Sequence, residues 1–267
     1  MPVPDDLRFR IAVARFPGFL IAALASASLF ACASPPPKAR SVLAGGAARN
    51  LLILPLNVTA IMSPELEDLS AFVWSELEIY LRAEGKRLRT ASFRDARRLW
   101  LSSVQQARAG EKGARAGFDD AARVLVLELA KHTDFDTVII PSLFIREAPI
   151  SGDTATWDGV ERSLEFEQKG RAVRGLSADS SFVGVAPAAS LHAVVLDAEG
   201  NKLQDAVGGL ELLARVRVKG ALDPAVGEPK LEFLPRTGGF ASSENLREGI
   251  AEALAPLFLP PLPLKTD

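Results

Sequence analysis

The sequence has a single cysteine among its 267 residues, so no disulfide can form within the chain. Its two histidines, His132 and His192, lie far apart in the sequence, and neither has a second histidine or cysteine at metal-ligand spacing. No phosphate-binding loop, dinucleotide fingerprint or nucleophile elbow is present, and Gly175-Leu176-Ser177 lacks the second glycine of an elbow. From its motifs we predict no catalytic residue, no metal ligand and no cofactor.

The chain also lacks an excess of positive charge, since its net charge is -2. A broad basic surface is what nucleic-acid binding requires, so we expect no nucleic-acid partner. Hydrophobic residues make up 48% and charged residues 24%, as in ordinary globular proteins. Local basic clusters do occur, and we interpret them as a solvated helix face or loop: Lys86, Arg87 and Arg89, then Arg94, Arg97 and Arg98.

The N-terminal segment has the layout of an export signal. Arg8, Arg10 and Arg15 form a positive flank, and residues 16–31 contain no charge. A spanning helix needs roughly 20 apolar residues, so this run is short for a permanent anchor. We therefore predict that residues 1–31 are a signal peptide.

The end of this run, Leu29-Phe30-Ala31-Cys32, resembles the bacterial lipobox, although Phe30 stands where a small or β-branched residue is usual. The resemblance implies that Cys32 is acylated and becomes the N-terminus of the mature chain. Two or more acyl chains give stable membrane anchoring. Ala33 is not acidic, which by the same resemblance favours the periplasmic leaflet of the outer membrane. The alternative is an uncleaved anchor followed by a buried cysteine.

Composition then divides the rest of the chain. Residues 32–49 are rich in Pro, Ser, Ala and Gly, which predicts a lipidated cysteine and a flexible tether. Residues 50–258 carry the periodic apolar patterns of a single α/β domain, and residues 259–267 form a Pro-rich tail.

The first half of this domain alternates strand and helix patterns. Residues 51–58 are an apolar run typical of a strand buried on both faces, with Pro55 near its end or at a bulge. Ser63 and Pro64 open a helix whose apolar stripe reaches Leu81, and Gly85 ends it. The patterns that follow predict these elements: a strand over 87–91, helices over 92–107 and 120–131, and a strand from 136 with a bulge or edge at Pro141.

The second half has antiparallel character. Residues 160–168 alternate apolar and polar side chains, with Arg162 on the apolar side. Further strands are expected over 191–196 and 210–218, with a turn over 197–201, and a helix from Ser243 should stop by Ala255. The predicted fold is α/β with α+β character in its second half. Its mixed sheet carries packed helices in the order β-α-β-α-α-β, followed by an antiparallel meander and a C-terminal helix.

The order of these helices and strands and several short sequence motifs resemble one group of bacterial envelope proteins. The segments are Leu52-Ile53-Leu54-Pro55-Leu56-Asn57, the helix after it, Gly85 before a basic strand, and Asp136-Thr137-Val138-Ile139. The group contains the curli secretion lipoprotein, the penicillin-binding-protein activator lipoproteins and the N-terminal domain of the Tol-Pal translocation protein. Phe135 and Pro141-Ser142 depart from its pattern. The resemblance implies a lipid-anchored periplasmic module that binds proteins or assembles at the envelope, and it supplies no catalytic residues.

Other chemistry-bearing residues have ordinary structural interpretations. We expect His132 to cap a helix or face water, His192 to pack or face water, and Asp119 and Asp120 to favour a helix start. The same applies to Trp100 and Trp157, which we assign to the core, and to the sequon Asn57-Val58-Thr59, which we assign to chance.

The sequence thus predicts a non-enzymatic envelope protein with a partner-binding or assembly role. Its partners would be the membrane, through acyl chains on Cys32, and an envelope protein. Two alternatives stay open at this point. One is a subunit of an outer-membrane secretion pore, against which Arg162 on an apolar strand face argues. The other is a cell-wall hydrolase.

Overall fold

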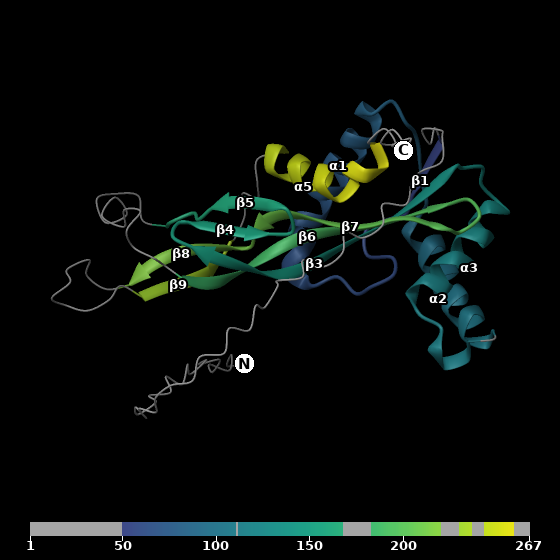
Figure 1. Ribbon diagram of the computed structural model, residues 1–267, viewed down its shortest axis with the longest axis horizontal. Coiled ribbons are helices and arrows are strands. Elements are labelled where there is room, and N and C mark those ends of the chain that lie inside the picture. Colours follow the sequence, from purple (N-terminus) through teal and green to yellow (C-terminus); the bar gives the residue numbers. More distant parts are fainter. Residues whose placement is uncertain (1–49, 111, 168–182, 220–229, 237–242, 259–267) are drawn as a thin grey trace, which may run out of the picture. The chain divides into compact units, whose positions relative to one another are not determined.

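The computed structural model describes residues 50–110, 112–167, 183–219, 230–236 and 243–258, and these form the predicted α/β fold (Figure 1). Strand β1 (Asn50–Ile53) lies between β2 (Arg87–Thr90) and β3 (Thr137–Ser151) and pairs in parallel with both. Leu51 and Leu52 point to opposite faces and are both buried, as the continuous apolar run predicts. Pro55 lies past the last ladder pair, where no donor is needed.

One face of the sheet is covered by α1 (Glu67–Ala83) and α5 (Ser243–Phe258). A single 3₁₀ turn, Pro64–Leu66, precedes α1, and Gly85 ends that helix with a φ of 71°. Every fourth or third residue of α1 is apolar and buried, and each such leucine contributes about 2 kcal/mol by leaving water. The first core contains, from these two helices, Leu69, Val73, Leu77, Leu81, Leu246, Ile250, Ala253 and Leu254.

The other face is covered by α2 (Phe93–Ala109) and α3 (Phe118–Ala130), joined through a 3₁₀ turn at Gly113–Arg115. Ser92 caps α2 by accepting a hydrogen bond from the Asp95 amide at 3.2 Å. Asp120 accepts a hydrogen bond from the Gly117 amide at 3.0 Å and so closes the start of α3. The side chains of these helices and of the sheet face beneath them form the second core.

Strand β3 continues far beyond the predicted segment. It pairs antiparallel with β6 (Val183–Asp197) along its whole length, and β6 pairs with β7 (Lys202–Leu212). Pro141 lies inside β3, but the Pro141 carbonyl accepts from Asn57 on the side where β1 has already ended. The missing N–H therefore faces a local edge, as predicted. The turn over 197–201 is also confirmed, because Asp197 accepts from the amides of Glu199 and Asn201.

Beyond the helix-covered region, short strands build a third core. Strand β3 turns into the hairpin of β4 (Thr154–Trp157) and β5 (Val160–Ser163), and β8 (Ala214–Lys219) pairs with β9 (Lys230–Pro235). Phe166 bridges to Val216, which links the two parts. The alternation predicted over 160–168 is confirmed as far as Glu167, and Gln168 lies outside the described residues.

Several predicted boundaries are wrong. The strand expected over 51–58 ends at Ile53, and the strand expected over 191–196 already begins at Val183. The single strand expected over 210–218 breaks at Leu213 into the end of β7 and the whole of β8, because the chain changes its partner strand there: Leu212 pairs with β6, whereas Ala214 pairs with β9. The helix expected to stop by Ala255 continues through Pro256 to Phe258. Its apolar stripe packs on the sheet up to Leu254, and this tertiary contact outweighs the local preference of a pre-proline residue.

Helix α5 approaches β7 very closely at a pair of glycines. A Cβ atom added to Gly208 would overlap the carbonyl oxygen of Gly249, and one added to Gly249 would overlap the carbonyl oxygen of Gly209. Backbone therefore packs directly on backbone at this point. Among the described residues, no helix is long and apolar enough to cross a membrane.

Candidate functional site

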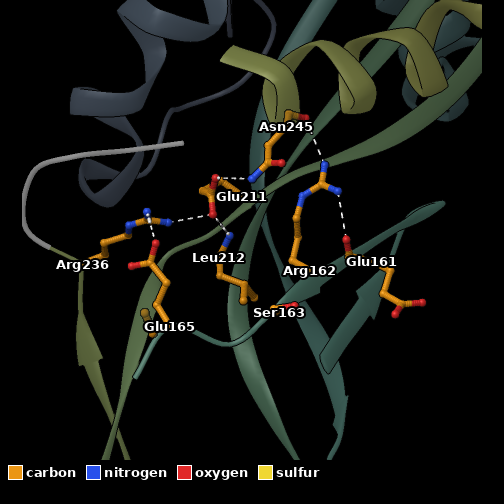
Figure 2. A pocket seen from close by; sticks show the side chains of 9 residues that line it. Glu161, Arg162, Ser163, Glu165, Glu211, Leu212, Arg236 and Asn245 are labelled. Carbon is orange, nitrogen blue, oxygen red and sulfur yellow. Dashed lines mark hydrogen bonds and ion pairs between the residues drawn. The ribbon is translucent and has the colours of Figure 1, made fainter. Parts of the chain in front are cut away.

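A polar cavity of about 450 Å³ lies where β5, β7, β8 and the first turn of α5 meet (Figure 2). Acidic and basic side chains face each other across it, and Asn245 reaches in from α5. Its lining residues are Glu161, Arg162, Ser163, Glu165, Glu211, Leu212, Ala214, Arg236 and Asn245.

Arg236 and Glu211 form the most deeply buried ion pair of this cavity. Their side chains are 8% and 6% exposed, and Nη1 of Arg236 donates to Glu211 at 2.7 Å. Nη2 of the same guanidinium donates to Glu165 at 2.8 Å. Arg236 directly follows β9, Glu211 belongs to β7 and Glu165 follows β5, so one guanidinium joins three separate segments of the chain.

Arg162 is the second buried guanidinium. The sequence places it on the apolar side of its strand, and its side chain is indeed only 7% exposed. It donates to the carbonyl of Asn245 at 3.0 Å, to its neighbour's carbonyl in β5, and to the Glu248 carboxylate at 2.6 Å. Arg162 thus ties the β4–β5 hairpin to α5.

The chemistry of this cavity is that of a structural ion network. Taking a charge out of water costs several kcal/mol, which only paired and hydrogen-bonded partners offset. Nη1 and Nη2 of both arginines donate to oxygens of this chain, while Nε of Arg236 is buried without a hydrogen-bond partner in the described part. Because the carboxylates of Glu165 and Glu211 accept from Arg236, these groups hold segments together.

A second polar cluster lies on the outer part of β6 and β7. His192 bonds Asp205 at 2.7 Å, and Lys202 donates to Asp205 at 3.0 Å and to Asp119 at 2.9 Å. Burial opposes ionisation of Asp205, but hydrogen bonds from His192 and Lys202 outweigh it and hold the pKa of Asp205 below its ordinary value. The hydrogen bond to Asp119 raises the pKa of Lys202. The cluster fastens the start of α3 to the β6–β7 hairpin.

The other described residues considered in the sequence analysis lie either in the core or on the surface. Trp100 and Trp157 are buried, so their assignment to the core is confirmed. His132 is exposed in the turn after α3, and His192 is one-third exposed in β6. Cys32, the signal and tether segments, Gly175-Leu176-Ser177 and residues 259–267 lie outside the described residues.

Sequence reasoning did not find Arg236, Glu211 or Glu165. The one available signal was Arg162, since a charged residue on the apolar side of a strand requires buried partners. Those partners come from segments far away in the chain. Within the described ranges, no group of His, Cys, Asp and Glu side chains is arranged to hold a metal ion.

Comparison with known proteins adds no relative, because no protein-family model and no curated protein matches the chain.

Proposed function

We propose that this chain is a lipid-anchored envelope protein that faces the periplasm and acts by binding or assembling with another envelope protein. The observation that carries the proposal is Leu29-Phe30-Ala31-Cys32, placed directly after the uncharged run 16–31 and a positive flank. Its cysteine is the sole one of the chain, at the position where acyl chains would be attached.

The use of charge in the domain supports a binding role over catalysis. The buried charged groups of Arg162, Arg236 and Glu211 form hydrogen bonds between segments of the fold. General acid–base or nucleophilic chemistry would need such groups to be directed at a substrate. Binding through the outer surface makes no such demand.

Acylation is tested by labelling cells with an alkyne-tagged fatty acid and comparing the wild type with Cys32→Ser. We expect label on the wild type alone, together with a mature N-terminus at position 32 in intact-mass spectrometry. Because Cys32 lies outside the described domain, circular dichroism of the two proteins should agree. An unlabelled wild-type chain that begins at Met1 contradicts the anchor.

The partner role is tested by crosslinking the tagged protein in cells and purifying it under denaturing conditions. We expect one dominant envelope protein at close to equal amount from the wild type, and a weaker band in Cys32→Ser, which lacks the acyl anchor. If the wild type gives no dominant band, the partner role is wrong.

A further inference from the structure

The segment that follows α1 concentrates positive charge on a chain that is acidic overall. Residues 86–98 contain six basic residues and a single acidic one, while the net charge of the protein is -2. The acidic residue, Asp95, pairs with Arg98 at 3.2 Å. Arg87, Arg89 and Arg94 are all exposed.

The register of β2 places its arginines on the side of the sheet that α2 and α3 cover. Side chains alternate along a strand, and Leu88 packs against the first core, so Arg87 and Arg89 point to the opposite face. Arg89 pairs with Leu52 of β1, whose side chain belongs to the second core beneath these helices. Only a few residues separate Arg89 from the first turn of α2, which brings the arginines of both elements to one surface.

The outer side of α2 adds apolar side chains to this charge. Phe93 is 55% exposed and Leu101 is 50% exposed, and both lie on the side of α2 that faces away from the second core. A shallow hollow is lined by Phe93, Arg94, Arg97, Arg98, Leu101, Ser102 and Gln105. Exposed aromatic and aliphatic groups among arginines are typical of helices that lie in the interface of a membrane.

The N-terminal segment joins the domain at this same place. Asn50, the first residue of β1, pairs directly with Arg87. Residues 33–49 contain Lys38, Arg40 and Arg49 and no acidic residue, and such a stretch can span at most about 60 Å. If Cys32 is acylated, the chain that leads from the anchor therefore enters the domain beside Arg87.

We propose that the surface formed by Arg87, Arg89, Arg94 and Arg98 with Phe93 and Leu101, here called the basic face, docks on the anionic headgroups of a phospholipid bilayer. The inference rests on the proposed function, because the acyl anchor is what holds the domain close to a membrane. The guanidinium groups bind headgroup phosphates, and Phe93 and Leu101 enter the upper acyl region. The bilayer is the occupant that matches both the charge and the apolar side chains of this surface.

The experiment measures the binding of unacylated residues 33–267 to vesicles by sedimentation. The buried hydrophobic side chains of all three cores lie between Leu51 and Leu254, so this chain keeps the whole described domain. Vesicles of about one-third phosphatidylglycerol in phosphatidylcholine are compared with pure phosphatidylcholine at about 0.1 M salt. The test variant replaces Arg87, Arg89 and Arg94 by Gln. The control replaces Arg82, Arg146 and Arg217, which lie on α1, β3 and β8, by Gln.

We expect binding that requires phosphatidylglycerol and weakens with salt. Each arginine at an anionic surface contributes about fivefold, so the test variant, which lacks three, should bind roughly a hundredfold more weakly while the control binds like the wild type. Phe93→Ser combined with Leu101→Ser should also weaken binding, since insertion of the apolar side chains is lost.

Three results would overturn the proposal: wild-type binding by the test variant, an equal loss in the control, or displacement by free glycerol phosphate at the same phosphate concentration. The last result would make the basic face a phosphate site and not a membrane surface. The vesicle experiment uses an unacylated chain, so a negative result there does not contradict acylation of Cys32. A negative labelling experiment, in turn, does not contradict binding of the basic face to vesicles.

Discussion

At the scale of single residues, the side chain of Asn57 makes hydrogen bonds to β3 that a neighbouring strand would otherwise make. Strand β1 ends at Ile53, so β3 has no strand neighbour on that side at Leu143. The buried amide of Asn57 accepts from the Leu143 N–H at 2.6 Å and donates to the Leu143 carbonyl at 2.9 Å. Asn57 adopts a φ of 58°, a conformation that asparagine tolerates better than most residues. Asn57, the first residue of the sequon that we assign to chance, thus satisfies the open edge of β3 through its side chain.

Asn57→Ala should lower the free energy of unfolding by about 3 kcal/mol, since two buried backbone groups lose their partner and alanine is strained at positive φ. Asn57→Gly removes the same hydrogen bonds without that strain and should cost about 1 kcal/mol less. Urea unfolding of the purified proteins measures both. Equal stability of Asn57→Ala and the wild type would contradict the role of the amide.

Arg247 and Glu76 give a pH-dependent contact between α5 and α1. Burial opposes ionisation of Glu76, but hydrogen bonds from Arg247, at 2.7 Å, and from Ser243 outweigh it and lower its pKa. A lowered pKa in the folded state adds stability above the unfolded value of about 4.3, and this stability is lost as the pH falls through the folded value.

Arg247→Gln should therefore cost about 1 kcal/mol at neutral pH, a modest amount because the arginine side chain is half exposed. The difference from the wild type should shrink as the pH falls from the unfolded value of about 4.3 through the lowered pKa of folded Glu76, because the carboxyl group then becomes protonated. Urea unfolding at several pH values tests this. A stability difference that grows as the pH falls would contradict the lowered pKa of Glu76.

At the scale of elements, the helices and parallel strands follow from local patterns, while the second half of the fold does not. The cap at Ser92, the stop at Gly85 and the buried run after Asn50 act within a few residues, so the sequence displays them directly. Strand β3 is long because β6 pairs with all of it, and the break at Leu213 lies where the chain changes its partner from β6 to β9. These features depend on partners distant in the chain, which periodicity cannot identify.

At the crossing of α5 and β7, replacing a helix glycine by alanine should lower stability, although helix propensity alone predicts that it should raise it. Gly→Ala in a helix ordinarily stabilises by up to about 1 kcal/mol. Gly249→Ala should instead destabilise by about 2 kcal/mol or more, because its Cβ would overlap the Gly209 carbonyl. Gly184→Ala in β6 is the control, since nothing lies within 4 Å of its added Cβ. Thermal unfolding of both variants decides, and a more stable Gly249→Ala would exclude backbone contact here.

At the scale of the whole described domain, three cores are joined by buried polar contacts. The first and second cores lie on the two faces of the sheet, and the third lies among the short strands beyond them. Arg236 and Arg162 bridge between β5, β7, β9 and α5 around the cavity. The network thereby holds the short strands in place beside the main sheet.

Removing one partner of the buried pair should cost more than removing both. Glu211→Leu leaves the Arg236 guanidinium buried with half of its partners and should destabilise by about 3 kcal/mol. Glu211→Leu combined with Arg236→Met removes the uncompensated charge and should recover at least about 1 kcal/mol of that loss. A double-mutant cycle by urea unfolding measures the coupling. Additive losses would mean that the two side chains do not act as a pair.

The sequence by itself determined the α/β class, the order of the helices and strands of the first half, and the antiparallel character of the second. These depend on apolar periodicity and on capping residues close in the chain. It also supplied the basis for the proposed anchor at Cys32, a motif that needs no fold. Only the tertiary structure decided the partners of Arg162, the cavity around Arg236, the role of Asn57 and the surface shared by β2 and α2. Each of these joins residues far apart in the chain, and a single sequence carries no record of which distant groups meet.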